Sequence, residues 1–192
     1  MSTVNILGFA GSLREKSYNR AALRAAQQLL PEDARLEIFD LSPIPPFNEE
    51  QEKTPPAAVS DFKRRIRAAD AILIATPEYN YSIPGVLKNA IDWASRPYGD
   101  SAWSGKPVAI LGASVGKLGT ARAQYHLRQI FVFLDMHPLN QPEVMIGPAG
   151  DAFDAAGELK DEKTRDLMRK QLKALVAWTQ ALTQGRALGL VP

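Results

Sequence analysis

Apolar residues along the chain gather in five short runs, and these runs predict buried strands. Three of them are nearly continuous in valine, isoleucine, leucine and alanine, as is typical of central parallel strands that are covered on both faces. The last run contains Pro142, which lacks a backbone N–H, so we expect it at an edge of the sheet. The five predicted strands are Thr3–Phe9, Arg35–Leu41, Asp70–Thr76, Pro107–Ala113 and Leu139–Ile146.

Helical patterns separate these strands. Pro84, for example, stands in the first turn of one such segment, where its missing N–H costs nothing. Strands and helices that alternate in this way predict a doubly wound α/β sheet. The predicted helices are Asn19–Leu30, Pro56–Ala69, Pro84–Ala94, Thr120–Met136 and Lys160–Thr183.

Length and composition favour one domain over residues 1–192, with no repeat and no linker. The chain has no cysteine, which excludes disulfides, thiolate metal sites and thiol nucleophiles. No apolar stretch approaches about 18 residues, and no basic residue precedes the N-terminal apolar run, so we expect a cytoplasmic protein without signal peptide or membrane span. The proline-rich stretch Leu41–Pro56 reads as a long loop, whose length favours a functional or partner-contacting role.

The charge balance argues against nucleic-acid and membrane partners. The 23 basic and 21 acidic residues are spread along the chain and give a net charge of +2. We interpret the densest basic run, Phe62–Arg67, as a solvated helix face. His126 and His137 have no ligand cluster around them, so we expect no metal site.

The loop Gly8–Arg20 follows the first strand and leads into a helix. Ligands of such sheets bind at the carboxyl ends of strands, and free N–H groups at a helix start attract anions. Gly11 lets the backbone turn, while Ser12, Ser17 and Asn19 offer short polar groups and Arg14 a planar fork suited to phosphate. Ordinary capping by Ser17 or Asn19 would explain only one of these four polar groups. The loop therefore predicts a phosphate site.

Other phosphate and catalytic motifs do not match. The dinucleotide fingerprint G-x-G-x-x-G is absent, since Ala10 and Leu13 follow Gly8, and Asp40 alone is weak evidence for a ribose-binding acid. Gly112–Thr120 resembles a P-loop but is one residue too short, and Leu118 stands where serine or threonine must hold magnesium. No Ser-His-Asp set or glycosidase carboxylate pair stands out.

The stretch Thr76–Trp93, "TPEYNYSIPGVLKNAIDW", crowds aromatic and polar residues into the loop after the third strand. Flavin mononucleotide (FMN) would fit one phosphate site beside such a loop. The backbone groups of Glu78, Tyr79 and Asn80 would meet the hydrogen-bonding edge of the flavin, and tyrosine rings would cover it. An ordinary turn held by Pro77 and Asn80 is the alternative.

Three segments carry a family resemblance: "GSLREKSYNR", Thr76–Trp93 and Gly112–Leu139. They resemble the NADPH-dependent FMN reductases of the flavodoxin-like fold, and among these the bacterial quinone reductases also described as chromate reductases. The resemblance implies a five-stranded parallel sheet in the order 2-1-3-4-5. Thr120 departs from the pattern, because a second glycine is expected after Gly119.

The resemblance also implies the site. It puts the FMN phosphate on residues of the first loop, the flavin ring on the aromatic loop, and a third loop near the ring. The implied residues are Ser12, Arg14, Ser17, Tyr18 and Asn19 for the phosphate, Pro77, Glu78, Tyr79 and Asn80 for the ring, and Ser114 and Gly116 near it.

The implied activity is hydride transfer from NAD(P)H through FMN to quinones or similar small acceptors. The flavin performs such chemistry, so we expect no strictly catalytic side chain, and we expect the Glu78 carboxylate to face solvent or a neighbouring chain. A flavodoxin-type electron carrier is a second hypothesis, although a pI near 8.9 and Arg14 weigh against it. A regulatory flavoprotein is a third.

The helix Thr120–Met136 is apolar on all sides between Ile130 and Leu134. A helix of this kind is covered on more than one side. Either the loop Leu41–Pro56 covers it or a second subunit does, and the resemblance implies a homodimer or homotetramer.

Overall fold

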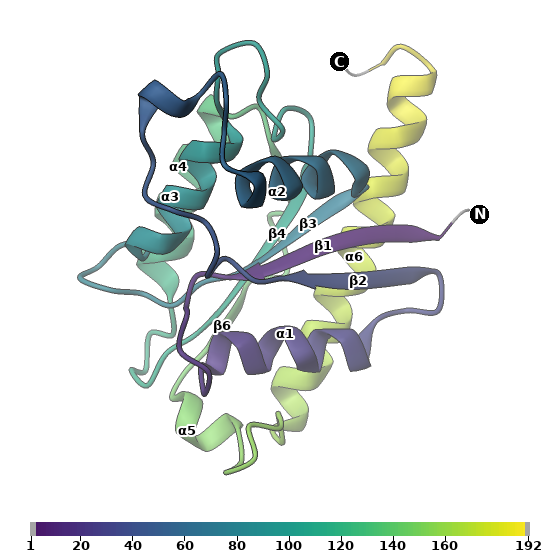
Figure 1. The fold of residues 1–192 in the computed structure, drawn as a ribbon. Helices are drawn as coiled ribbons and strands as arrows, with labels where there is room; N and C mark the ends of the chain where they lie inside the picture. The colour runs from purple at the N-terminus through teal and green to yellow at the C-terminus, as the bar shows by residue number, and fades with distance from the viewer. Residues whose placement is uncertain (1–2, 191–192) are drawn as a thin grey trace.

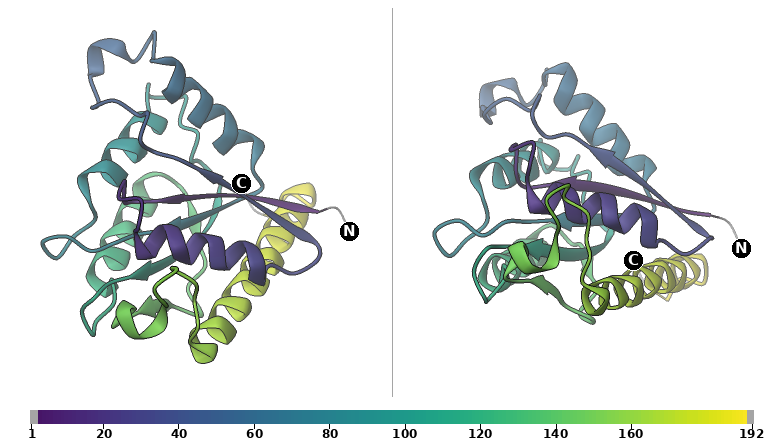
Figure 2. Two further views of the ribbon diagram at one scale, coloured as in Figure 1. Left: turned by 60° about the horizontal axis from the view of Figure 1, so that its bottom comes forward. Right: turned by 90° about the horizontal axis from the view of Figure 1, so that it is seen from below.

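A parallel sheet forms the middle layer of the protein, and helices cover both of its faces (Figures 1 and 2). The computed structural model describes residues 3–190. The strand order is β2-β1-β3-β4-β5, and β6 also pairs with β4, so the predicted order is confirmed. The strands are β1 (Val4–Ala10), β2 (Ala34–Phe39), β3 (Ala71–Ala75), β4 (Pro107–Ala113), β5 (His137–Pro138) and β6 (Val144–Ile146).

Two hydrophobic cores lie on opposite faces of this sheet. Because successive side chains of a strand point to opposite faces, Ile6 of β1 joins the core under α1 and α6, while Leu7 joins the core under α2, α3 and α4. The five long helices were predicted at these places, with ends that differ by a few residues. The helices are α1 (Tyr18–Leu29), α2 (Ala57–Ala68), α3 (Gly85–Ala94), α4 (Ala121–Phe133), α5 (Ala149–Ala152) and α6 (Glu162–Ala187), with a 3-10 turn η1 (Glu49–Gln51).

The fifth predicted strand, Leu139–Ile146, is wrong as a continuous element. Only β6 lies within this range, and β5 comes just before it. The two short strands pair in parallel with opposite ends of β4. Pro142 lies in the gap between them, where it has no N–H to offer β4. The buried amide of Gln171 on α6 fills the gap by donating to the carbonyls of Ile110 (2.9 Å) and Pro142 (3.0 Å).

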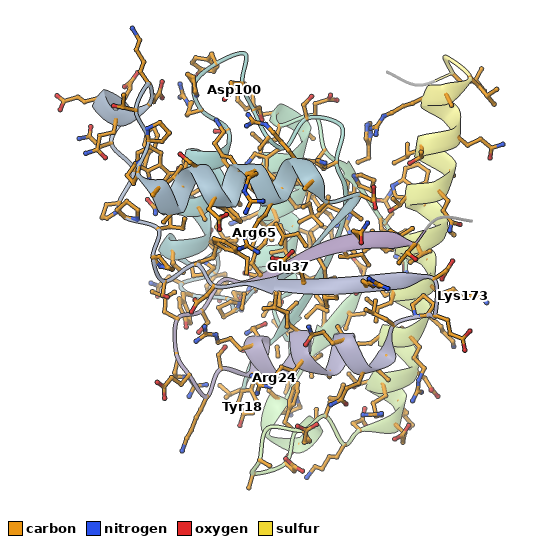
Figure 3. All side chains as sticks on the ribbon, turned by 45° about the vertical axis from the view of Figure 1, so that its right-hand side comes forward. Tyr18, Arg24, Glu37, Arg65, Asp100 and Lys173 are labelled. Atoms are coloured by element: carbon orange, nitrogen blue, oxygen red, sulfur yellow. The ribbon has the colours of Figure 1, made fainter. Side chains whose placement is uncertain are left out.

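The basic run Phe62–Arg67 is not the fully solvated face that its charge predicted. Lys63 is buried and donates to Asp100 at 2.7 Å, and Arg67 also pairs with Asp100. Hydrogen bonding from Lys63 holds the pKa of the Asp100 carboxyl below its usual range. These contacts tie α2 to the loop before β4, and Figure 3 shows Asp100 in that loop, above α2.

The long loop Leu41–Pro56 lies against α3. The Asn89 side chain accepts from the N–H of Phe47 (2.7 Å) and donates to the carbonyl of Pro45 (2.8 Å). The indole of Trp93 donates to the same carbonyl. Two side chains of α3, about one turn apart, therefore hold this loop.

Candidate functional site

The loop after β1 packs closely against the start of α3. A Cβ on Gly11 would lie 3.0 Å from the Pro84 ring and 3.2 Å from Leu87, so glycine lets the two segments approach. The Gly11 N–H donates to the carbonyl of Ala75, at the end of β3. The predicted phosphate loop thus lies beside the loop that follows β3.

The loop after β1 contains backbone N–H groups that have no hydrogen-bond acceptor among the described residues. The N–H groups of Ser12, Leu13 and Arg14 have no acceptor within residues 3–190. Ser17 caps α1 by accepting from the N–H of Asn19, while the Arg14 side chain is exposed. These residues lie in the loop that leads into α1, and successive free N–H groups in such a loop can bind a phosphate.

The Asn19 side chain contacts the end of β4. Its side chain is buried and makes two hydrogen bonds of 2.9 Å with the N–H and the carbonyl of Ala113, at the end of β4. Both ends of the amide are therefore used inside the protein. Asn19 therefore positions the loop, and its role toward a phosphate stays a prediction.

The loop after β3 presents its aromatic rings to solvent. Tyr79 is 54% exposed and Tyr81 is 68% exposed. Asn80 and Tyr81 have φ angles of 50° and 68°, a left-handed conformation that costs free energy for residues other than glycine. The N–H groups of Glu78 and Asn80 find no acceptor in the described part of the chain.

The Glu78 carboxylate turns inward, and the expectation that it faces solvent or another chain is wrong. Its side chain is only 5% exposed and forms an ion pair with Arg122. It also accepts from the N–H groups of Arg122 (3.0 Å) and Ala123 (3.2 Å). Thr120 makes no capping bond with its own side chain, so Glu78 caps α4 in its place.

Two contacts from α4 to the aromatic loop were missed in the sequence. The Arg122 guanidinium lies over the Tyr81 ring, 3.7 Å from its centre. One turn further, His126 Nδ1 lies 2.8 Å from Ser82 Oγ. The i, i+4 spacing of these two side chains was the available signal, since it places them on one helix face.

The third loop, after β4, is tightly folded. The Ser114 hydroxyl accepts from the N–H of Gly116 at 3.2 Å. Thr120 is buried against Gly112, where any Cβ would overlap its side chain. The threonine that replaces the expected glycine therefore points into the protein and does not narrow the outer side of this loop.

The loops that follow β1, β3 and β4 thus lie at the same edge of the sheet, at the carboxyl ends of these strands. Within residues 3–190, no three His, Cys, Asp or Glu side chains are grouped so as to hold a metal ion. None of the helices in this part of the chain combines the length and the apolar composition of a membrane span.

Residues 4–151 match the family described as NADPH-dependent FMN reductase. The chain belongs to this family. The NAD(P)H-dependent FMN reductase of Pseudomonas aeruginosa is 59% identical over 180 residues, which cover 93% of this chain and 97% of that protein. The quinone reductase of Escherichia coli is 41% identical over 181 residues, or 92% and 96% of the two chains.

A solved structure supports the same assignment of fold. FerB, a flavoenzyme NAD(P)H:(acceptor) oxidoreductase from Paracoccus denitrificans, superposes with a TM-score of 0.86 at 35% identity. The match covers 93% of this chain and 98% of FerB. The flavodoxin-like fold implied by the sequence is confirmed.

Replacing Glu78 with glutamine tests its capping role. Glu78→Gln removes the charge that faces Arg122 and the start of α4, so we expect it to lower the free energy of unfolding by about 1–3 kcal/mol. Urea denaturation measures the change. Glu32→Gln, an exposed carboxylate without a partner in residues 3–190, serves as the control and should shift stability by less than about 0.5 kcal/mol. Equal losses in both variants would contradict the cap.

Proposed function

We propose that this protein is an FMN-dependent NAD(P)H oxidoreductase that passes a hydride to quinones or similar small acceptors. One observation carries the proposal: free backbone donors in the loop before α1 and in the loop after β3 lie at one edge of the sheet, in a chain whose relatives are named as such reductases. The whole chain, residues 1–192, would serve as a single FMN-binding domain. Its cytoplasmic location stays a prediction.

The first loop would hold the FMN phosphate. The free N–H groups between Ser12 and Arg14, the hydroxyls of Ser12 and Ser17 and the exposed Arg14 fork suit a dianion. Tyr18 packs against Phe153, with ring centres 5.4 Å apart, and closes one side of this loop. Asn19 would contribute by fixing the loop to β4.

The other two loops would hold the flavin ring. The segment Pro77–Asn80 offers free N–H groups to the polar edge of the ring, and the Tyr79 side chain offers apolar cover. Ser114 and Gly116 would lie near the ring from the third loop. When bound, FMN supplies the two-electron chemistry, so the residues of this chain bind and orient the reactants and none is assigned as a strictly catalytic residue.

We also propose that the protein is a homodimer or homotetramer. On α4, Val132 is 84% exposed and Phe133 is 77% exposed. The loop Leu41–Pro56 lies against α3 and leaves Val132 and Phe133 exposed, so this loop does not cover the two side chains. Apolar residues of this size favour burial by a second copy of the chain.

A visible spectrum tests the activity. Protein reconstituted with FMN should be yellow and should bleach rapidly when NADPH is added without oxygen, because hydride transfer reduces the flavin. A quinone should then restore the colour. Flavin that binds but is not bleached by NADPH or NADH would favour an electron carrier or a regulatory flavoprotein over the reductase.

Arg14→Ala tests the phosphate assignment. Loss of one charge-assisted contact typically costs about 1.5–3 kcal/mol, so FMN affinity should fall about 10- to 150-fold. Riboflavin, which lacks the phosphate, should bind variant and parent about equally, and Arg14→Lys should recover only part of the FMN affinity. Fluorescence titration of the apoprotein measures both ligands, and a thermal melt checks the fold. Unchanged FMN affinity would refute the assignment.

Phe133→Glu tests the assembly. Light scattering at micromolar concentration should give the mass of a dimer or tetramer for the parent and a smaller mass for the variant, because the glutamate would bury a charge in the contact. Leu188→Glu, at another exposed apolar residue, is the matched control and should leave the mass unchanged. A parent of monomer mass would exclude the proposed assembly.

A further inference from the structure

Nearly every arginine that the structure describes donates to a carboxylate or a carbonyl group. Within residues 3–190, only Arg14, Arg24 and Arg35 lack such a partner. Arg14 has a proposed partner in the FMN phosphate, and Arg24 and Arg35 have none. An unpaired guanidinium that lines a groove is a candidate anion site.

Arg24 lines a groove of about 370 Å³ between α1 and the segment 154–157, together with Arg14 and Lys16. Figure 3 shows Tyr18 and Arg24 on α1, and both residues line this groove. Lys16 is exposed and, like Arg24, has no hydrogen bond or ion pair in the described part of the chain. We call this the Arg24 groove.

No carboxylate of the Arg24 groove forms an ion pair with these cations within residues 3–190. Asp154 accepts from the N–H groups of Ala156 and Glu158, both at 2.9 Å, and so closes its own loop. Glu15 also lines the groove, but it pairs with no basic residue among those described. The guanidinium of Arg24 and the ammonium of Lys16 therefore keep their hydrogen-bond donors available to an anion.

A second groove lies between α1 and β2, and Arg24 lines it too. The other basic residue of this second groove, Arg20, pairs with Asp40 at 2.8 Å. Burial would raise the pKa of Asp40, but hydrogen bonds from Ser42 and the charge of Arg20 lower it overall. The second groove thus contains an ion pair, whereas the Arg24 groove has none among the described residues.

We propose that the Arg24 groove binds the 2′-phosphate of NADPH and makes the protein prefer NADPH to NADH. This inference rests on the proposed reductase function. NADPH differs from NADH by one phosphate dianion, and the planar fork of Arg24 with the ammonium of Lys16 suits that group. The Tyr18 ring and the backbone of residues 155–157 would form the wall beside the adenosine.

A direct binding experiment tests the groove. FMN-loaded protein is titrated calorimetrically with adenosine 2′,5′-bisphosphate and, separately, with adenosine 5′-monophosphate. Arg24→Gln should lower the affinity for the bisphosphate by about 10- to 150-fold and leave the affinity for the monophosphate unchanged. In steady-state kinetics the KM for NADPH should rise, with kcat and the KM for NADH unaltered.

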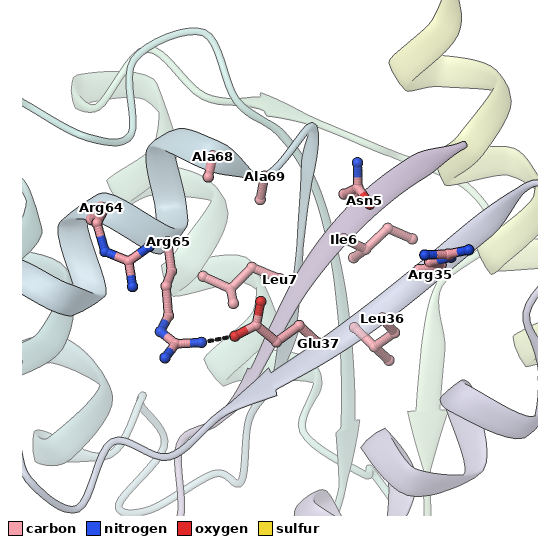
Figure 4. A pocket seen from close by; sticks show the side chains of 10 residues that line it. All are labelled: Asn5, Ile6, Leu7, Arg35, Leu36, Glu37, Arg64, Arg65, Ala68 and Ala69. Atoms are coloured by element: carbon pink, nitrogen blue, oxygen red, sulfur yellow. Dashed lines mark hydrogen bonds and ion pairs between the residues drawn. The ribbon is translucent and has the colours of Figure 1, made fainter. Parts of the chain in front are cut away.

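Arg35→Gln is the matched control. Arg35 is exposed and equally without a partner in residues 3–190, but it lies on β2 in a groove beside α2, away from the start of α1 (Figure 4). Its replacement should change neither titration nor either KM. Figure 4 also shows that the nearby Arg65 pairs with Glu37, so Arg35 is the unpaired arginine of that groove.

Three results would overturn the proposal. The first is equal bisphosphate affinity in parent and Arg24→Gln. The second is an equal loss in Arg35→Gln, which would point to net charge alone. The third is a weaker affinity for FMN but not for riboflavin, which would assign Arg24 to the cofactor phosphate. Failure of the reductase function is a separate observation, because neither nucleotide would then bleach the flavin of the parent.

Discussion

The double hydrogen bond between the Asn19 side chain and the backbone of Ala113 sets the geometry of the whole site. It joins residues 94 positions apart in the sequence and spans from the start of α1 to the end of β4, across the intervening strands. A buried amide with both ends satisfied is stable only in one arrangement, because a shift would leave a donor and an acceptor unpaired. The loops after β1 and β4 are therefore fixed relative to each other.

Close packing of backbone against backbone completes this frame. A Cβ on Gly147 would overlap the carbonyl of Gly116, and one on Gly112 would overlap the carbonyl of Thr76. At these positions glycine is required by space, since neighbouring backbone cannot move aside as a flexible side chain would. Together with Gly11 at Pro84, these contacts bring three loops to one edge of the sheet.

The sequence predicted the strands and helices well where a single periodic pattern decides the structure. Four strands and five long helices lie where their apolar residues placed them, and the family resemblance supplied the strand order. The pattern did not predict the burial of charged side chains whose partners lie far away in the sequence. Glu78 turns inward because α4, 44 residues later, offers it N–H groups and Arg122. Lys63 is buried because Asp100 and a backbone carbonyl accept from it.

The same limit applies to the site. The loops proposed to hold the phosphate and the flavin could be placed from strand ends alone, since the carboxyl ends of parallel strands meet at one edge. The structural role of Asn19 and the contacts of Arg122 and His126 with the aromatic loop depend on pairs that no local pattern reports. The left-handed backbone at Asn80 and Tyr81 and the exposure of the tyrosine rings follow from the fold of the loop. The sequence pattern does not indicate them.

The gap between β5 and β6 has a consequence for how the molecule behaves at high concentration. An exposed, continuous edge strand is a template on which another chain can add a strand and begin to aggregate. Here the edge beside β4 is broken into pieces of two and three residues, and α6 supplies Gln171 to the carbonyls that the gap leaves bare. Arg35 and Glu37 place charges along β2 at the opposite edge. Both margins of the sheet thus discourage intermolecular strand pairing.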